Sequence, residues 1–542
     1  MTIQRPSVVT VRLNFFLANG FRTLLWGSIF GIAGYATPAL AQTDAYGNLT
    51  PSASNTGLNY AYRDSTFPSS DNPYVTSDSS GSQSFVPKGA LASLASSYDV
   101  GYYLVAETIQ ATDVGGVLSV PSATSTSVAR ISVLAGNYVT VSSTTLHIDV
   151  SGANTYAVLY QNVVSGVDIT NKNGSVAYVE NNTADGVVIE NNSATMSVIQ
   201  NSASNAHIVN ENGSVMNFVG NNANGATLIN NASQLELLDT TADNATIFNQ
   251  NNAKMNIDTS ETTNTSLTNE SGSSITMLNN TVSGVDMHNI SATMEAEKNT
   301  LSGGTITNVD GGYMYMKNNS MDGGSFINGS TSDSSSTMIL IQNIAKNTDI
   351  ENYGSTEMYG DNLLGSTLIA GANSYMIIGD CSVSRGCTSD GGTTAENITF
   401  TNDGVADVSG HVSLSGSHVI NNETLNLSDA TLTGNGNIDN AGTLNILGTN
   451  SIDSNIENAG TLNVTYGTST LSGSINGNGS MSVKNSTAIL SGSSDYTGSI
   501  TVQDGLLDVL GTVSNSTVNL QAGATVQGGG GIEEPLIDVL RG

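Results

Sequence analysis

Gly-Val-Asp-Ile-Thr-Asn, residues 166–171, is the first copy of the segment that decides the fold. It returns as Gly-Val-Val-Ile-Glu-Asn at 186–191 and as Asn-Ala-His-Ile-Val-Asn at 205–210. Later copies keep an apolar residue two places before an Asn, at steps of 19 or 20 residues until a last step of 24. The recurring residues are Asn171, Asn191, Asn210, Asn230, Asn249, Asn269, Asn289, Asn308, Asn328 and Asn352. A further copy at 368–370 has Ala370 in place of the Asn.

Each copy is followed by a short run in which apolar residues alternate with other residues. Met196-Ser-Val198 and Leu235-Glu-Leu237 are examples, and a period of two predicts a β-strand. The Asn-Gly, Asn-Asn and Ser-Gly pairs between the runs favour tight corners. We therefore interpret each repeat as strand, turn, strand, turn. Because one repeat cannot bury its apolar face alone, the repeats must stack, and the period predicts an all-β, right-handed parallel β-helix.

The recurring Asn has two structural interpretations that the sequence leaves open. The residues would either stack into a side-chain amide ladder along the axis, or occupy corners with positive φ. At about 4.8 Å per coil, roughly 20 to 24 coils would form a rod on the order of 100 Å long.

The composition argues against several classes of function. The 542 residues carry 14 Lys+Arg against 45 Asp+Glu, a net charge of -31, which disfavours binding to nucleic acid or anionic membranes. Only 2 cysteines are present, so the chain is not a disulfide scaffold. The excess of Asn, Ser, Thr and Gly suits the corners and half-buried strands of a repetitive β-structure.

The first 41 residues differ from the rest of the chain. They hold basic but no acidic residues, an apolar run at 24–33, and Ala39-Leu40-Ala41. This pattern predicts a signal peptide at 1–41, cleaved after Ala41, and hence an exported protein. An N-terminal anchor helix is the alternative, although the apolar run is short for a membrane span.

The remaining chain divides by composition and repeat type. We expect a low-complexity, disordered or irregular leader at 42–85, N-terminal coils or a cap at 86–164, and the repeats of about 20 residues at 165–375. A loop with a cysteine pair at 376–395 precedes a second repeat family at 396–531 and an aberrant tail at 532–542. Cys381 and Cys387 predict a small local disulfide in an exported protein, with two free thiols as the alternative.

No catalytic, cofactor or metal site is predicted. The histidines form no metal-binding spacing, and no G-x-S-x-G nucleophile elbow is present. Lys172, Lys254, Lys298 and Lys317 fall on separate coils, whereas a lyase acting on acidic sugars needs clustered cations. A glycosidase pair of carboxylates stays open because acidic residues are plentiful. We therefore expect a protein that is not an enzyme and uses no cofactor.

Two segments carry a resemblance to known families. The middle repeats resemble those of AIDA-type autotransporter adhesins, although Asn often stands where that family has Gly. The segment from Ala488 to Leu507, with Leu490-Ser-Gly492, Tyr496-Thr-Gly498 and Gly505-Leu-Leu507, is similar to the passenger-associated repeat of type V secreted proteins. Together these resemblances span roughly 165–531.

The resemblance implies an autotransporter passenger domain that acts in adhesion, autoaggregation or biofilm growth. Its partners would be like passengers, or glycans and proteins of a cell surface. The C-terminal β-barrel translocator of that family does not follow residue 542, so we expect a truncated gene or a separately encoded barrel. The chain would lie at the cell surface or outside the cell if a translocator exists, and otherwise in the periplasm. The alternatives are a β-helical, pectin-lyase-like enzyme that cleaves polysaccharides, and a fragment without function.

Overall fold

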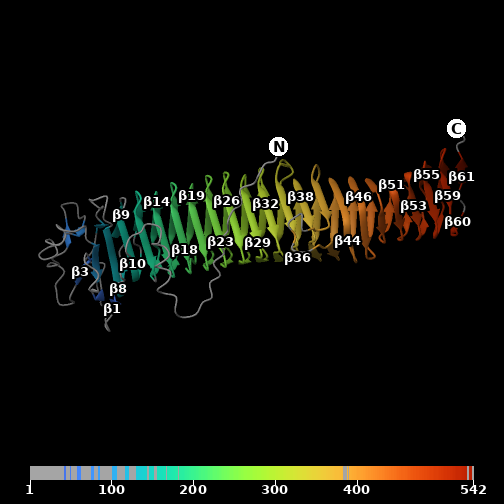
Figure 1. Cartoon of the computed structure of the whole chain (residues 1–542). Coiled ribbons are helices and arrows are strands. Elements are labelled where there is room, and N and C mark those ends of the chain that lie inside the picture. The colour runs from blue at the N-terminus through green and yellow to red at the C-terminus, as the bar shows by residue number, and fades with distance from the viewer. Residues whose placement is uncertain are drawn as a thin grey trace.

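The computed structural model is an elongated all-β solenoid in which the chain winds as stacked coils (Figure 1). It describes residues 168–533 except 181, 383–386 and 388–389, together with the strand Leu536–Val539 and several strands before residue 168. About 19 turns of parallel strands are present, which confirms the prediction of an all-β parallel β-helix. Among the described residues, no helix is long and apolar enough to cross a membrane.

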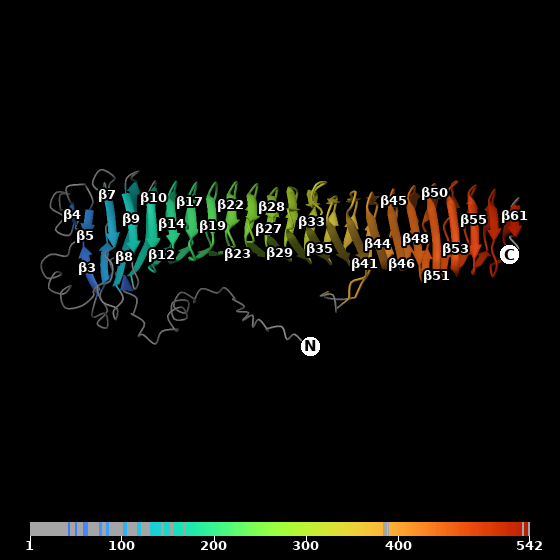
Figure 2. The same ribbon diagram turned by 90° about the horizontal axis from the view of Figure 1, so that it is seen from above.

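One coil consists of three strands. In an early coil these are β11 (Asp168–Lys172), β12 (Val176–Glu180) and β13 (Thr183–Asp185). Each pairs in parallel with its equivalent in the next coil, β14 (Val188–Asn192), β15 (Thr195–Ile199) and β16 (Ser202–Ser204). Strands equivalent to β11 form a first sheet, and strands equivalent to β12 and β13 form a second sheet (Figure 2).

The third strand corrects the expected pattern of two strands per repeat. It is three residues long and turns only its middle side chain inward, such as Ala184 in β13 or Ala203 in β16. A single small inward residue gives almost no periodic signal, so the sequence pattern did not reveal it. The first two strands each bury two side chains and show the expected alternation.

The interior is a continuous column of stacked apolar side chains. Ile169, Ile189, Ile208 and Leu228 follow one another in register, and each is at most 2% exposed. Equivalent residues therefore contact equivalent residues in the next coil. This stacking buries the apolar face that a single repeat would leave in water.

The corners between strands use residues that tolerate positive φ. Asn173 and Gly174, between β11 and β12, have φ of 58° and 77°, and Asn212 and Gly213 repeat these values two coils later. A left-handed backbone costs Asn and Gly less than other residues. The corner residues are thus distinct from the recurring Asn, none of which has positive φ.

The second repeat family continues the same solenoid. The strand β40 (Thr367–Ala370) pairs in parallel with β43 (Thr399–Asn402) across the boundary of the two families. In this part some second and third strands merge into one, as in β46 (Thr424–Thr433) and β53 (Ser480–Leu490). A stacked glycine row permits tight corners: a Cβ on Gly498 would lie 1.8 Å from the carbonyl oxygen of Gly479.

Two insertions interrupt the regular winding. One occupies residues 329–336, between β34 (Ser325–Asn328) and β35 (Thr337–Ile341). The other follows β41 (Tyr375–Gly379), carries the two cysteines, and ends at β42 (Thr393–Glu396). Because these coils are longer than 20 residues, the number of turns is slightly smaller than the period alone implies.

Several sequence predictions fall outside the described residues. They are the signal peptide at 1–41, cleavage after Ala41, most of the leader at 42–85, and the last residues of the tail at 532–542.

Candidate functional site

The described interior of the solenoid is packed with apolar side chains. An interior void of about 30 Å³ lies in the coils that include Phe400, Leu414 and Ile438. Apolar side chains dominate its lining, so this space is a packing defect of about the size of one water molecule.

The ten predicted Asn residues form one buried row in the first sheet. Each Nδ2 donates to the Oδ1 of the next Asn, at distances from 2.7 to 3.0 Å between Asn171 and Asn352. Most also donate to a backbone carbonyl, as Asn249 does to Ser274 at 2.9 Å. Of the two interpretations, the structure adopts the amide ladder, whose role is structural.

The ladder stops at Asn352 because the next position is Ala370, and it resumes in the second repeat family. There Asn402, Asn421, Asn440 and Asn458 continue the row, and the Nδ2 of Asn458 donates to the Tyr496 hydroxyl at 2.9 Å. This continuation was not predicted, because the second family differs in its surrounding sequence.

A second buried amide ladder was also missed. It precedes the third strand of the coil and contains Asn182, Asn201 and Asn221 and later Asn280, Asn299, Asn319 and Asn343. Thr240 and Ser260 replace Asn in two intervening coils. The signal lies in the same period of 20, but Asn is so common in this chain that a row with two substitutions does not stand out.

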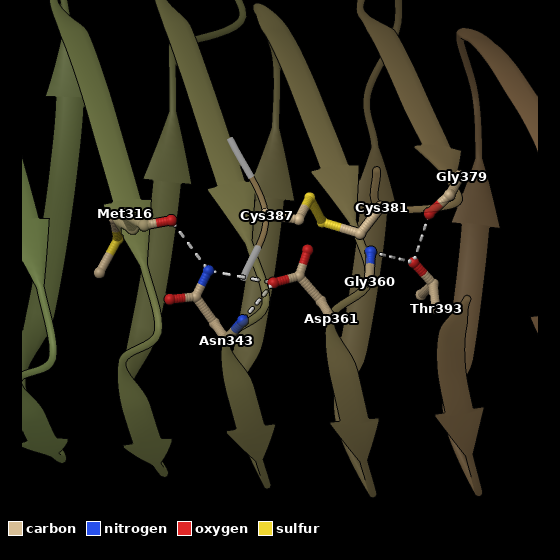
Figure 3. Close-up of a disulfide and its surroundings, with 8 residues drawn as sticks. All are labelled: Met316, Asn343, Gly360, Asp361, Gly379, Cys381, Cys387 and Thr393. Carbon is tan, nitrogen blue, oxygen red and sulfur yellow. Dashed lines mark hydrogen bonds between the residues drawn. A yellow bond between two sulfur atoms is a disulfide. The ribbon is translucent and has the colours of Figure 1, made fainter. Parts of the chain in front are cut away.

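Cys381 and Cys387 form a disulfide with a Cα–Cα distance of 5.8 Å. The two cysteines pack against Ile341 and Tyr359 on the outer side of the second sheet, and these residues are only 2% and 6% exposed. Figure 3 shows the disulfide above Asp361, the acidic residue that ends the second ladder. The disulfide therefore covers outward side chains of the second sheet that belong to two neighbouring coils.

Next to this loop, tyrosines and carboxylates from successive coils gather on the outer side of the second sheet. We call this surface the tyrosine–carboxylate face, and its strands are β29 (Thr293–Glu297), β32 (Tyr313–Lys317), β35, β38 (Ser355–Tyr359), β41 and β44 (Val405–Ser413). One outward row contains Tyr313, Thr337, Ser355 and Tyr375, and the neighbouring row contains Glu295, Tyr315, Ile339, Glu357, Ile377 and Asp407.

The hydroxyl groups on this face point to carboxylates. The Tyr375 hydroxyl donates to Asp407 Oδ2, and the Tyr359 hydroxyl donates to Glu357 Oε2 at 3.0 Å. The bond to Asp407, with burial and nearby negative charge, raises the pKa of Tyr375 to about 12. Burial and the charges of Glu295 and Glu357 also raise the pKa of Tyr313. These tyrosines therefore remain neutral donors at any ordinary pH.

Few cations balance this face. Lys317 lies beside Glu297 in the register of β29 and β32. Lys298 pairs with the same carboxylate, with its Nζ 2.9 Å from Oε1. Glu295, Glu357 and Asp407 have no ion pair with a described lysine or arginine within the distance of a salt bridge. The surface is therefore acidic as well as aromatic.

The histidines of the described chain do not build a site together. His288 Nδ1 lies 2.8 Å from the Thr307 hydroxyl, and His418 Nε2 lies 2.7 Å from Asp439 Oδ2, both on the first sheet. Within the described ranges, no group of three His, Cys, Asp or Glu side chains could hold a metal ion.

Comparison with known proteins gives only distant matches. No family model and no curated protein matches the chain. Among solved structures, the PL6 family alginate lyase AlyGC is 10% identical with a TM-score of 0.21, and the match covers 81% of this chain and 87% of the lyase. The autotransporter UpaB from E. coli strain CFT073 is 12% identical with a TM-score of 0.13, and that match covers 80% of this chain and 95% of UpaB.

The presence of a lyase among these matches contradicts the expectation that the chain is not an enzyme. That expectation rested on scattered lysines and on missing sequence motifs. It did not take into account that stacking brings carboxylates and tyrosines from distant repeats onto one face.

Proposed function

We propose that this chain is an exported contact protein, similar to an autotransporter passenger, that mediates adhesion or autoaggregation through the outer faces of its solenoid. The repeats that resemble those of AIDA-type adhesins form the coils from β11 to β41. Its partners are like chains or the glycans and proteins of a cell surface.

The observation that carries this proposal is the ordered array of polar side chains along the rod. One outward row of the first sheet holds only polar residues in register from coil to coil, namely His207, Thr227, Thr246, Ser266, Asp286, Thr305, Ser325, Asp349 and Thr367. An array with one spacing over many coils can match a partner that is itself periodic. Many weak contacts then add up to stable attachment.

Surface display tests this function. Bacteria that display the chain through a heterologous translocator are expected to clump, and deletion of residues 165–375 should abolish the clumping. Deletion of 396–531 is the matched control for a shortened rod. Equal clumping with and without 165–375, at equal surface density, would refute the proposal.

A second candidate function is cleavage of a polysaccharide, and the tyrosine–carboxylate face favours it. Three carboxylates from different coils lie on this face, those of Glu295, Glu357 and Asp407. Most glycoside hydrolases use a pair of carboxylates as their catalytic groups. The test is the release of reducing ends from a panel of polysaccharides. Activity that disappears in Glu357→Gln and survives in Glu457→Gln, an exposed residue of the first sheet, would support an enzyme.

A further inference from the structure

We propose that the tyrosine–carboxylate face binds a polysaccharide that carries protonated amino groups. This inference rests on the proposed contact function, because it names the site and the class of one ligand. Three features of the face support it: the spacing of two tyrosines, the surroundings of the strip between them, and the negative charge.

Two exposed tyrosines mark the ends of a strip along the rod axis. Tyr313 is 36% exposed and Tyr375 is 38% exposed, whereas most large apolar side chains of the described chain are buried. They occupy the same outward row, with Thr337 and Ser355 in the two coils between them. Three steps of about 4.8 Å place the two residues about 14 Å apart. An extended oligosaccharide parallel to the axis spans that distance and meets an aromatic side chain at each end.

The floor between the tyrosines suits a sugar. Thr337 and Ser355 are small and offer hydroxyl groups, so a ring lying between the two tyrosines meets no bulky side chain in this row. The next row supplies Ile339 and Ile377, which are half-buried, with Glu357 between them. Alternating apolar and hydrogen-bonding surface matches the faces and edges of a pyranose.

The disulfide between Cys381 and Cys387 bounds the strip on one side. It covers Ile341 and Tyr359, which occupy the outward row beyond Ile339 and Glu357. Because the two cysteines pack on the outer surface of the sheet, the disulfide stands above the level of the strip. A ligand on the strip therefore has a wall on one side.

The charge of the face selects the class of polysaccharide. Glu295, Glu357 and Asp407 repel uronate polymers and attract ammonium groups. Tyrosine rings favour the same ligand, because the interaction of a cation with an aromatic face contributes about 0.5–1 kcal/mol of binding free energy at an exposed site. An acidic second copy of this chain is disfavoured on this face by like charge, given the net charge of -31.

Titration calorimetry with the purified full chain tests the site. The probe is a chitosan oligosaccharide, and the comparison ligands are its fully N-acetylated form and an oligogalacturonate. We expect binding of chitosan, weaker binding of the N-acetylated form, and no binding of the galacturonate. Addition of salt should weaken the binding of chitosan, because the carboxylates are partly exposed.

Matched variants locate the binding. Tyr313→Ala and Tyr375→Ala should each weaken chitosan binding about fivefold, the equivalent of ~1 kcal/mol. Tyr466→Ala removes another exposed tyrosine, outside the face, and should leave affinity unchanged. Glu357→Gln should lower affinity for chitosan but not for the N-acetylated form, with Glu457→Gln as its control. Unchanged melting temperatures show that the variants are folded.

Three outcomes overturn the inference. Equal affinity for all three sugars would show that the charge of the face does not select the ligand. An equal loss of chitosan affinity in Tyr313→Ala and Tyr466→Ala would show that the ligand does not bind at this face. If no sugar binds while displayed chains still clump cells, this site fails and the contact function stands. If clumping is also absent, both proposals fail.

Discussion

Asp361 ends the second amide ladder, and its replacement by Asn should stabilise the solenoid at neutral pH. The backbone N and the Nδ2 of Asn343 donate to Asp361 Oδ1 at 2.7 and 3.0 Å (Figure 3). The side chain is 1% exposed, and its Oδ2 has no hydrogen-bond partner. Burial is the main cause that raises the pKa of this carboxyl from 3.8 to about 7.

The size and sign of the effect follow from this shift. Because the folded-state pKa lies above the unfolded value, the folded chain holds the proton more tightly. The stability that Asp361 contributes is complete below about pH 4 and is lost as the pH rises through about 7. A shift of about three units at 1.36 kcal/mol per unit makes the loss on the order of 4 kcal/mol.

The amide introduced by Asp361→Asn would keep the accepting oxygen and carry no charge. Its nitrogen would also act as a donor at the place of the carboxylate oxygen that lacks a partner in the native chain. In the preceding coil, Asn343 Nδ2 donates to the carbonyl of Met316 at 3.0 Å, and Leu340 occupies the register of Met316 one coil later. We expect the new amide to donate to the carbonyl of Leu340 in the same manner.

The assay is urea unfolding of the wild type and of Asp361→Asn at pH 5 and pH 8, followed by circular dichroism. Since a solenoid can unfold in parts, hydrogen exchange of residues 343–361 provides the local readout. The variant should equal or exceed the wild type at pH 5 and exceed it by several kcal/mol at pH 8. Asp453→Asn, at an exposed position, is the control and should change little. If Asp361→Asn destabilises the chain at pH 8, the reasoning about this buried carboxyl is wrong.

Two further predictions concern the first ladder and the disulfide. Asn249→Ala leaves buried partners without hydrogen bonds, so it should lower the free energy of unfolding by about 2–4 kcal/mol. Asn256→Ala, which changes an outward residue of the same coil, should lower it by less than ~0.5 kcal/mol. Urea unfolding measures both variants, and equal losses would contradict a structural role of the ladder. Replacement of Cys381 and Cys387 by Ser should uncover Tyr359 while costing less than ~3 kcal/mol. Nitration of Tyr359, followed by mass spectrometry, measures this exposure, and an unreactive Tyr359 in the variant would show that the loop stays in place without the disulfide.

The recurring Asn shows which features of the fold a local sequence pattern can predict. Its spacing predicts the coil and the alternation next to it predicts strands, because both follow from interactions between neighbouring residues and between identical repeats. The choice between ladder and corner is different. It depends on whether Asn171 points inward or sits at a turn, and the turn belongs to Asn173 two residues later. A shift of two residues lies within the precision of any boundary read from sequence.

The third strand and the second ladder were missed for a related reason. A strand of three residues, such as β13, turns one side chain inward, and Asn182 beside it is one Asn among many. Their roles are set by contacts with the coils before and after. Such contacts have no signature within one repeat.

The sequence alone determined the solenoid, its coil length and its acidic, polar surface, because a repeated apolar pattern has one economical way to be buried. The tertiary structure alone decided which side chains gather on one face. Insertions of unequal length separate Glu295, Glu357 and Asp407 by irregular distances in sequence. Because the strands pair in parallel and in register, the inserted residues lie outside the strands and do not shift the pairing. The three carboxylates therefore lie on the same face as Tyr313 and Tyr375. Which residues lie close together therefore depends on the place that each residue occupies within its coil. That place is known only from the tertiary structure.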